Sequence, residues 1–595
     1  MEKFFNLLCT GVFIVAVIFL FYVLSGKQNK KRLIPVFIVL VITFLVDLIN
    51  TYTPEFKIIY AMLYVLFILA IMFFMGCDFN CKGMDYEKKM SFLTKLFFVF
   101  YLLLVFKTAW VSDDAYITFR VADNFVNGYG LRWNVEERVQ VFTNTLFLFV
   151  FIPFYFIFRD AYFVSLFLNF LFSIATILLL KKTVDSKEKF LIIIVGLCFS
   201  KAYIDFSTSG LENSLTFFLL ALFLYVLIKF KKSDKKSLYL TLVFSCLFLN
   251  RPDSVLIILP AILLTLYRDR PPVKIILSGL IPLFAWETFS VIYYGFPLPN
   301  TFYAKLNTGI GRLALIKQGV DYFFNSILID PVTLFTVFSA IIVGSTGLIK
   351  KKNEVFPFVS AGIVLYLLYV LYIGGDFMSG RFFACCIPVS LFMASDLMKK
   401  QKFIYAFLLT LVFLCLNSPF YSVYNFSVEN RMMTRNSVQV ISEREFYYRV
   451  TGLLNVLTKG KKVIDESGYA KDAKRLKNDA SMQKKTAIST AIGMFGFYAG
   501  PDVYIIDQVS IADAFTARLP AAKRWRIGHF AREWPEGYEE TLRQETNLIK
   551  DGDLSVLYEK ICLITKGKIF TKERFKTILE INFKKDFYRK ENVSQ

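Results

Sequence analysis

Two adjacent acidic residues are the first candidates for catalysis in this sequence. Asp113 and Asp114 follow an apolar stretch that ends at Trp110, and apolar residues recur at helical spacing directly after them. A carboxylate held ionised at the start of a helix can accept a proton from a hydroxyl group. The pair could also bind a divalent cation, the one cofactor that the sequence suggests. The competing explanation is a solvated helix N-cap, formed by Ser112 or Asp113.

Four other loops between apolar stretches join Gly or Pro to a few polar side chains. Arg suits bidentate phosphate contacts and Lys supplies a point charge, so the basic residues of these loops are candidates for holding a phosphate. They are Arg251, Lys305 and Arg381, and the same loops carry the predicted substrate contacts Glu212, Asp253, Asn300 and Asp376. The alternative is that each cation simply pairs with Asp253 or Asp376.

The composition indicates which elements must position these residues. Of 595 residues, 56% are hydrophobic and only 19% are charged, which excludes a water-soluble globule, a disordered chain and a disulfide scaffold as readings of the whole chain. Apolar runs predict a polytopic α-helical membrane protein with about fourteen transmembrane helices. The predicted spans lie near 4–24, 33–52, 57–76, 92–111, 161–180, 190–206, 212–229, 237–251, 254–267, 275–294, 332–349, 356–373, 382–398 and 402–418.

Short basic loops predict the orientation, because Lys and Arg gather on the cytoplasmic side of a membrane. They share that side only if the apolar stretch 142–158, which contains Pro153, lies along the interface instead of crossing it. The acidic pair, the four polar loops and the C-terminal part then all face the outer side. The same rule accounts for the net charge of +22 without a nucleic-acid partner. We therefore predict a multi-pass membrane protein with an extracytoplasmic site.

The predicted domains are 1–90 with three transmembrane helices, 91–418 with the catalytic module and a first outer loop at 111–160, and 419–595 as a soluble outer domain. In that last domain, 484–500 and 503–508 are predicted strands, while 468–479 and 537–551 are predicted helices, which gives a mixed α/β fold. His529, the only histidine, either fixes a loop by hydrogen bonding or contacts carbohydrate.

Two segments resemble one known family. Residues 113–144, DDAYITFRVADNFVNGYGLRWNVEERVQVFTN, are similar to the first outer loop of the GT-C glycosyltransferases. The likeness is strongest to the branch with the mycobacterial terminal β-(1→2) arabinofuranosyltransferases and proteins labelled as flagellar motor-control proteins. Residues 496–542, with YAGPDVYIID and WRIGHF, resemble the same branch. The chain departs from the pattern at Gln140 and Val141, and around Asp513 it reads SIADAFT.

The resemblance implies a GT-C membrane fold and a sugar donor carried on a polyprenyl phosphate in the membrane lipid. It also implies that Asp113 or Asp114 is the base in a single inverting transfer, with a pentose such as arabinofuranose as the sugar. The expected acceptor is a cell-envelope glycan, a lipid-linked sugar or a glycoprotein. Within the first match, Arg120, Trp133 and Asn144 are further candidates for substrate contact. The alternatives are a lipid-linked sugar transporter and a non-catalytic membrane assembly factor.

Overall fold

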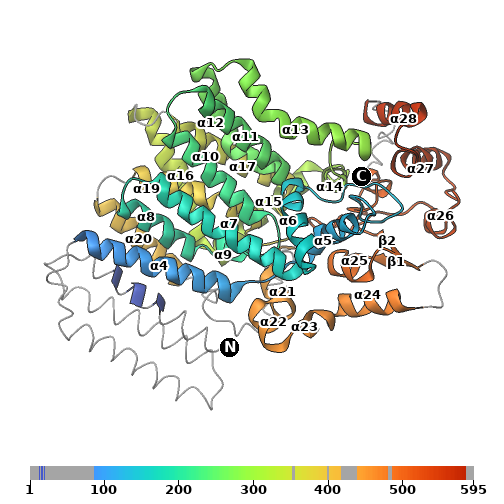
Figure 1. Ribbon diagram of the computed structural model, residues 1–595, viewed down its shortest axis with the longest axis horizontal. Helices are drawn as coiled ribbons and strands as arrows, with labels where there is room; N and C mark the ends of the chain where they lie inside the picture. The colour runs from blue at the N-terminus through green and yellow to red at the C-terminus, as the bar shows by residue number, and fades with distance from the viewer. Residues whose placement is uncertain are drawn as a thin grey trace, which may run out of the picture.

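The computed structural model describes residues 12–13, 15–17, 19–20, 86–350, 355–397, 401–416, 439–479 and 485–583. Most of the predicted domain 1–90 therefore lies outside the described residues, including the predicted spans at 33–52 and 57–76 and most of the span at 4–24. The described chain is mostly helical, and most of its helices pack side by side in one bundle (Figure 1). This architecture confirms the broad prediction of a helical membrane protein.

Apolar helices form where the sequence predicts spans. They are α4 (Tyr86–Thr108), α7 (Ala161–Thr183), α8 (Lys187–Phe199), α10 (Asn213–Lys229), α11 (Asp234–Asn250), α12 (Val255–Asp269), α13 (Val273–Tyr293), α16 (Pro331–Lys350), α17 (Phe356–Ile373), α19 (Ile387–Leu397) and α20 (Gln401–Leu416). Among the described helices, α4, α7, α13 and α17 are each long and apolar enough to cross a bilayer. The total of about fourteen spans stays a prediction, because several of the other helices are shorter than a bilayer core requires.

One helix, α15 (Arg312–Ile329), was not expected from the sequence. Lys317 and Asp321 interrupt its apolar pattern, which hides it from a search for hydrophobic runs. It meets α16 at an angle of 110°. Together the two helices are long and apolar enough for one broken membrane span. Short helices complete this part: α9 (Lys201–Asp205), η2 (Pro252–Ser254), α14 (Asn300–Leu306) and α18 (Arg381–Ala384).

The helices α10 to α13 separate the basic loops from the polar loops. At one end of the bundle, the Lys232 ammonium donates to the carbonyl of Arg268 at 3.1 Å. At the other end, the Asn250 amide donates to the carbonyl of Glu212, also at 3.1 Å. Successive helices of this set run in alternate directions, so the described basic loops at 229–236 and 267–274 lie at one end of the bundle and the polar loops around Glu212 and Asn250 lie at the other.

The first predicted outer loop contains two helices, α5 (Asp113–Val126) and α6 (Thr145–Phe158). The helix α5 starts at the acidic pair and ends before Gly128, whose φ of +88° is a left-handed conformation that favours glycine. The helix α6 has 14 residues and contains Pro153. At about 1.5 Å per residue it is too short to cross a hydrocarbon core of about 30 Å, which agrees with the expected interfacial position.

The C-terminal segment 439–583 lies at the end of the bundle where the polar loops gather, beside α5 (Figure 1). Its elements are α21 (Glu443–Thr451), α22 (Leu453–Lys459), α23 (Lys462–Asp465), α24 (Gly468–Asn478), β1 (Lys485–Ser489), α25 (Gly493–Ala499), β2 (Val503–Asp507), η4 (Thr516–Arg518), α26 (Tyr538–Gln544), α27 (Gly552–Thr565) and α28 (Lys572–Phe583). The strands β1 and β2 pair in parallel, with Lys485 opposite Val503.

Both predicted strand segments contain a strand, but the first one is not a strand throughout. Residues 493–499 form α25, because this stretch is the crossover between two parallel strands and packs on α5. The aromatic and small residues GMFGFYA imitate a buried strand in sequence, which explains the error. The predicted helix at 468–479 is confirmed as α24, and the one at 537–551 is confined to α26.

Candidate functional site

Asp113 connects the membrane bundle to the C-terminal segment. Its two carboxylate oxygens accept the backbone N–H groups of Gly493, at 3.1 Å, and Met494, at 2.8 Å. The carboxylate therefore satisfies the first turn of α25, 380 residues away, and neither it nor the Ser112 side chain caps α5 as expected. Burial raises the pKa of Asp113 to about 6, and the Met494 N–H partly offsets this effect.

Asp114 is the freer member of the pair. Its side chain is 29% exposed, compared with 6% for Asp113 as a residue. Among the described residues, its carboxylate has one polar contact, a long ion pair of 3.9 Å with Arg381. Asp114 can therefore accept a proton without giving up a short hydrogen bond, whereas Asp113 already uses both oxygens.

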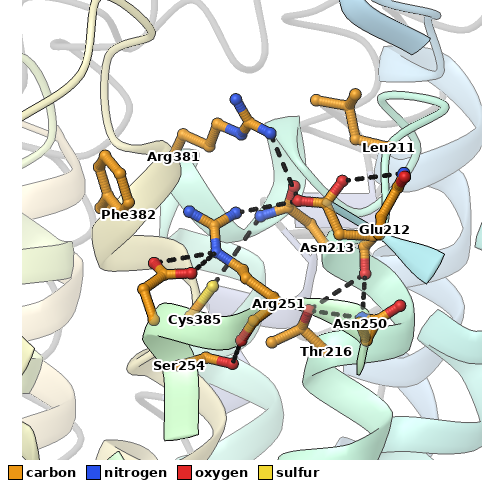
Figure 2. Close-up of polar contacts among 12 residues, drawn as sticks. Leu211, Glu212, Asn213, Thr216, Asn250, Arg251, Ser254, Arg381, Phe382 and Cys385 are labelled. Carbon is orange, nitrogen blue, oxygen red and sulfur yellow. Dashed lines mark hydrogen bonds and ion pairs between the residues drawn. The ribbon is translucent and has the colours of Figure 1, made fainter. Parts of the chain in front are cut away.

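Glu212 holds two arginines together at the centre of the polar loops. Its Oε1 lies 3.3 Å from a terminal nitrogen of Arg251 and 3.3 Å from one of Arg381 (Figure 2). Arg251 also contacts the Asp253 carboxylate at 3.3 Å, and Arg381 lies 3.6 Å from Asp376. With the longer Arg381–Asp114 contact, the two cations share four carboxylates, and this includes the pairing with Asp253 and Asp376 that the sequence left open as an alternative to phosphate binding.

Lys305 differs from the two arginines. Within the described residues, no hydrogen bond or ion pair is recorded for its ammonium group, although it lines the same cavity. This cavity has a volume of about 230 Å³ and is also lined by all the other charged residues predicted in the polar loops: Glu212, Arg251, Asp253, Asp376 and Arg381. The prediction that separate loops form one polar cavity therefore agrees with the geometry, and Lys305 brings to it a charge without a neutralising contact.

An apolar groove of about 590 Å³ adjoins the polar cavity. The two share Thr145, Leu249 and Trp286 as lining residues. Apolar side chains of α5, α6 and α13 form the groove, including Phe149 and Phe289. Because α13 is mostly exposed along its length, the groove opens on the side of the bundle that would face lipid.

Several predicted substrate contacts instead hold the structure together. The Arg120 guanidinium is buried and donates to the carbonyls of Trp133, Gly496 and Val503, and it also stacks on the Trp133 ring at 4.5 Å. The Asn300 amide donates to the carbonyls of Ser510, Ile511 and Asp513. Arg120, Trp133 and Asn300 thus fasten the C-terminal segment, and none of them lines the cavity. Any substrate contact by them stays a prediction.

Asn144 and His529 lie at the margins of the site. The Asn144 amide donates to Thr118 at 3.2 Å and to the Glu212 carboxylate at 3.5 Å, so it helps to orient Glu212. The centroid of the His529 ring lies 4.3 Å from that of Phe377 in an edge-on contact, and its Nδ1 has no hydrogen-bond partner among the residues that the structure describes. Burial lowers the pKa of His529, and the negative charge of Asp114 acts in the opposite direction. The charge of Asp114 therefore influences the protonation of His529.

Two acidic residues near the site were not singled out from the sequence. Glu287, on α13, lines the cavity, and an acidic residue within an apolar helix is a signal that could have identified it. Glu443, the first residue of α21, is buried and experiences the charges of Asp114, Asp113 and Asp376. Its sequence neighbourhood carries no signal of this, since it becomes part of the site only through tertiary contacts.

The residues that could hold a metal ion are few. Within the described parts of the chain, no three His, Cys, Asp or Glu side chains form a group suited to bind one. Of the acidic pair, only Asp114 has a carboxylate free of backbone hydrogen bonds. A divalent cation at the pair therefore stays a prediction, with Asp114 as its available ligand.

Comparison with known proteins identifies two curated relatives. Over 516 residues the chain is 24% identical to a Mycobacterium tuberculosis protein named terminal beta-(1->2)-arabinofuranosyltransferase, and the match covers 72% of this chain and 81% of that protein. A Corynebacterium glutamicum protein of the same name is 26% identical over 392 residues, which cover 58% of this chain and 56% of the relative. No family model and no solved structure matches the chain. These similarities confirm the resemblance found in the sequence.

Proposed function

We propose that this protein is a membrane glycosyltransferase that transfers a pentose, such as arabinofuranose, from a polyprenyl-phosphate donor. The acceptor is a cell-envelope glycan, a lipid-linked sugar or a glycoprotein. The protein belongs to the bacterial inner membrane, and the site faces the extracytoplasmic side. The named relatives support the sugar transfer. The described basic loops at 229–236 and 267–274 lie at the end of the bundle opposite the polar loops, which supports the orientation.

The observation that carries this proposal is the junction between the polar cavity and the apolar groove at Thr145, Leu249 and Trp286. A polyprenyl-phosphate sugar has a charged phosphate, a polar sugar and a long hydrocarbon chain. The junction offers a matching environment for each part: cations in the cavity, an apolar groove for the first isoprene units, and Asp114 beside Arg381 for the reacting sugar.

The reaction needs one displacement. Asp114 accepts the proton of the acceptor hydroxyl, and the hydroxyl oxygen forms a bond to the anomeric carbon of the donor. The bond between that carbon and the phosphate oxygen breaks, and its electron pair leaves with the polyprenyl phosphate. Lys305 and Arg381 stabilise the negative charge that accumulates on the departing phosphate. Attack opposite to the leaving group inverts the configuration at the anomeric carbon.

A reconstituted assay tests the proposal. The purified protein in liposomes receives radiolabelled decaprenyl-phosphoryl arabinofuranose, and the other polyprenyl-phosphate sugars are supplied one at a time. We expect label to move from the donor into a glycoside only with a pentose donor. If the label crosses the liposome membrane without forming a glycosidic bond, the protein is a transporter and the proposal is wrong.

A further inference from the structure

The helix α21 connects the two loops that carry the acids of the site. Just before its start, the N–H of Ile441 donates to the carbonyl of Phe377 at 2.8 Å, directly beside Asp376. At its end, the Thr451 hydroxyl donates to the carbonyl of Val111 at 2.7 Å, two residues before Asp113. The start of α21 is therefore held against the Asp376 loop, and its end is held against the segment that leads into the acidic pair.

The residues that flank Glu443 fix the position of this helix start. The Arg444 guanidinium forms an ion pair with Asp205 at 2.7 Å, and the Ser442 hydroxyl accepts from the Lys201 ammonium at 3.3 Å. Glu443 itself lies between these anchors with 7% of its surface exposed. Within the described residues, its carboxyl group has no recorded hydrogen bond or ion pair. The carboxyl group of Glu443 is therefore available to hydrogen-bond a ligand.

Two tyrosines extend the same face toward water. Tyr447 follows Glu443 by one helical turn, so the two side chains lie on one face of α21. Tyr469, on α24, is 38% exposed. Burial raises the pKa of both tyrosines, and the charges of Asp113 and Glu443 raise it further. Glu443 and Tyr447 thus share one face of α21, and Tyr469 adds an exposed hydroxyl that the charges of the same acids influence.

These residues lie outside the lining of the cavity to which Lys305 belongs. Glu443, Tyr447 and Tyr469 do not line that cavity, although Arg381, the ion-pair partner of Asp114, does. A transferase needs two such approaches to its base, one for the donor and one for the acceptor. The apolar groove suits the donor, and Glu443 together with the exposed Tyr469 suits a sugar that arrives from water.

We propose that Glu443 is an acceptor-binding residue, and that its carboxyl group donates a hydrogen bond to the acceptor sugar and so positions the reacting hydroxyl beside Asp114. This role rests on the proposed function and adds to it the residue that selects and orients the acceptor. Tyr447 forms the wall of the acceptor subsite, and Tyr469 stands at its entrance.

The protonation state of Glu443 fits this role. Burial raises its pKa well above the ordinary value, and the charges of Asp114, Asp113 and Asp376 raise it further, against the opposing charge of Arg526. A neutral carboxyl group has an O–H that can donate to a sugar oxygen. The two acids then act differently on one acceptor: Glu443 donates to it, and Asp114 accepts its proton.

Acceptor kinetics test the assignment. The reconstituted protein receives decaprenyl-phosphoryl arabinofuranose as the donor and an alkyl arabinofuranoside as the acceptor, and KM is measured separately for each. We expect Glu443→Ala to raise the acceptor KM about tenfold, the effect of one buried hydrogen bond, with the donor KM unchanged. Glu443→Gln keeps a donor group and should restore the acceptor KM to within about threefold of the wild-type value. The exposed Glu466 supplies the matched control, Glu466→Ala.

The outcomes separate the two proposals. Melting temperatures of the variants in detergent show whether they fold. An unchanged acceptor KM in a folded Glu443→Ala variant would overturn the acceptor role while leaving the transferase function intact. A Glu443→Gln variant as inactive as one without Asp114 would also overturn it, because Glu443 would then need its charge. Absence of transfer by the wild-type protein would overturn both proposals.

Discussion

Asp113 and Asp114 are adjacent in the chain, but their carboxylates contact different parts of the protein. Asp113 accepts two backbone N–H groups from the start of α25, whereas the carboxylate of Asp114 makes a 3.9 Å contact with Arg381 as its single polar contact in the described part of the chain. One acid is committed to holding the C-terminal segment, and the other remains available for proton transfer. Their substitutions should therefore have separable effects on stability and on catalysis.

Asp113 predicts a pH dependence of stability. Its pKa is about 6 in the folded protein, compared with an ordinary value of 3.8. Because the folded-state pKa is the higher one, the stabilising contribution is complete below about pH 4 and is lost as the pH rises through about 6. We expect the melting temperature in detergent to fall by about 1–3 °C more over this window in the wild type than in Asp113→Asn.

Other buried acids titrate in the same direction, so only the difference between the two proteins reports on Asp113. Asp502→Asn is the matched control, because Asp502 is exposed on the same segment. Parallel melting curves of the wild type and Asp113→Asn across the whole window would contradict the assignment.

Gly493 predicts a steric effect at the same contact. A Cβ atom at this position would lie 1.9 Å from the backbone oxygen of Asp113, which has no room to move. We expect Gly493→Ala to separate α25 from α5, to lower the melting temperature by several degrees and to reduce transfer at least about tenfold. Gly468→Ala is the control, since a Cβ there meets no atom within 4 Å. Equal behaviour of the two variants would show that the contact is dispensable.

Lys305 predicts a donor-specific defect. Its ammonium group faces the cavity without a recorded carboxylate partner, so its charge is available to a phosphate. Lys305→Met should raise the donor KM by about tenfold, and Lys305→Arg should raise it less. The control is Lys274→Met, which removes an exposed lysine from the start of α13. A change in the acceptor KM alone would show that Lys305 contacts the acceptor and not the donor phosphate.

The groove predicts a dependence on the length of the lipid chain. Ala285 lines the groove and is exposed, so Ala285→Trp would fill space that the isoprene units need. We expect a rise of about tenfold in the KM for a decaprenyl donor and little change for a donor with a short alkyl chain. Leu277→Trp, at an exposed position elsewhere on α13, is the control. An equal effect on both donors would exclude the groove as the lipid site.

Much of the architecture could be predicted from the sequence, because a bilayer requires hydrophobic runs in the helices that cross it and basic residues in the loops on its cytoplasmic side. The start of α5 at Asp113 and the convergence of the polar loops also agreed with the structure. The helix α15 was missed because its polar residues break the apolar run. The segment 493–499 was misassigned because its composition suits a buried strand as well as a helix.

The roles of individual polar residues could not be predicted, because they depend on partners far away in the sequence. Nothing near Asp113 indicates that Met494 will donate to it, and nothing near Glu443 indicates that it will lie beside Asp114. Arg120 and Asn300 are polar residues in segments where the sequence predicted substrate contacts. Their hydrogen-bonding capacity is nevertheless directed to backbone carbonyls of the C-terminal segment.

The central claim is that Asp114 is the base for transfer from a lipid-linked pentose. Its most direct test is the initial rate of label transfer from decaprenyl-phosphoryl arabinofuranose by the Asp114→Asn variant in liposomes. We predict a loss of at least about a hundredfold, the usual contribution of a general base, with the melting temperature and the donor KM unchanged. A folded Asp114→Asn variant that transfers label at the wild-type rate would contradict the account.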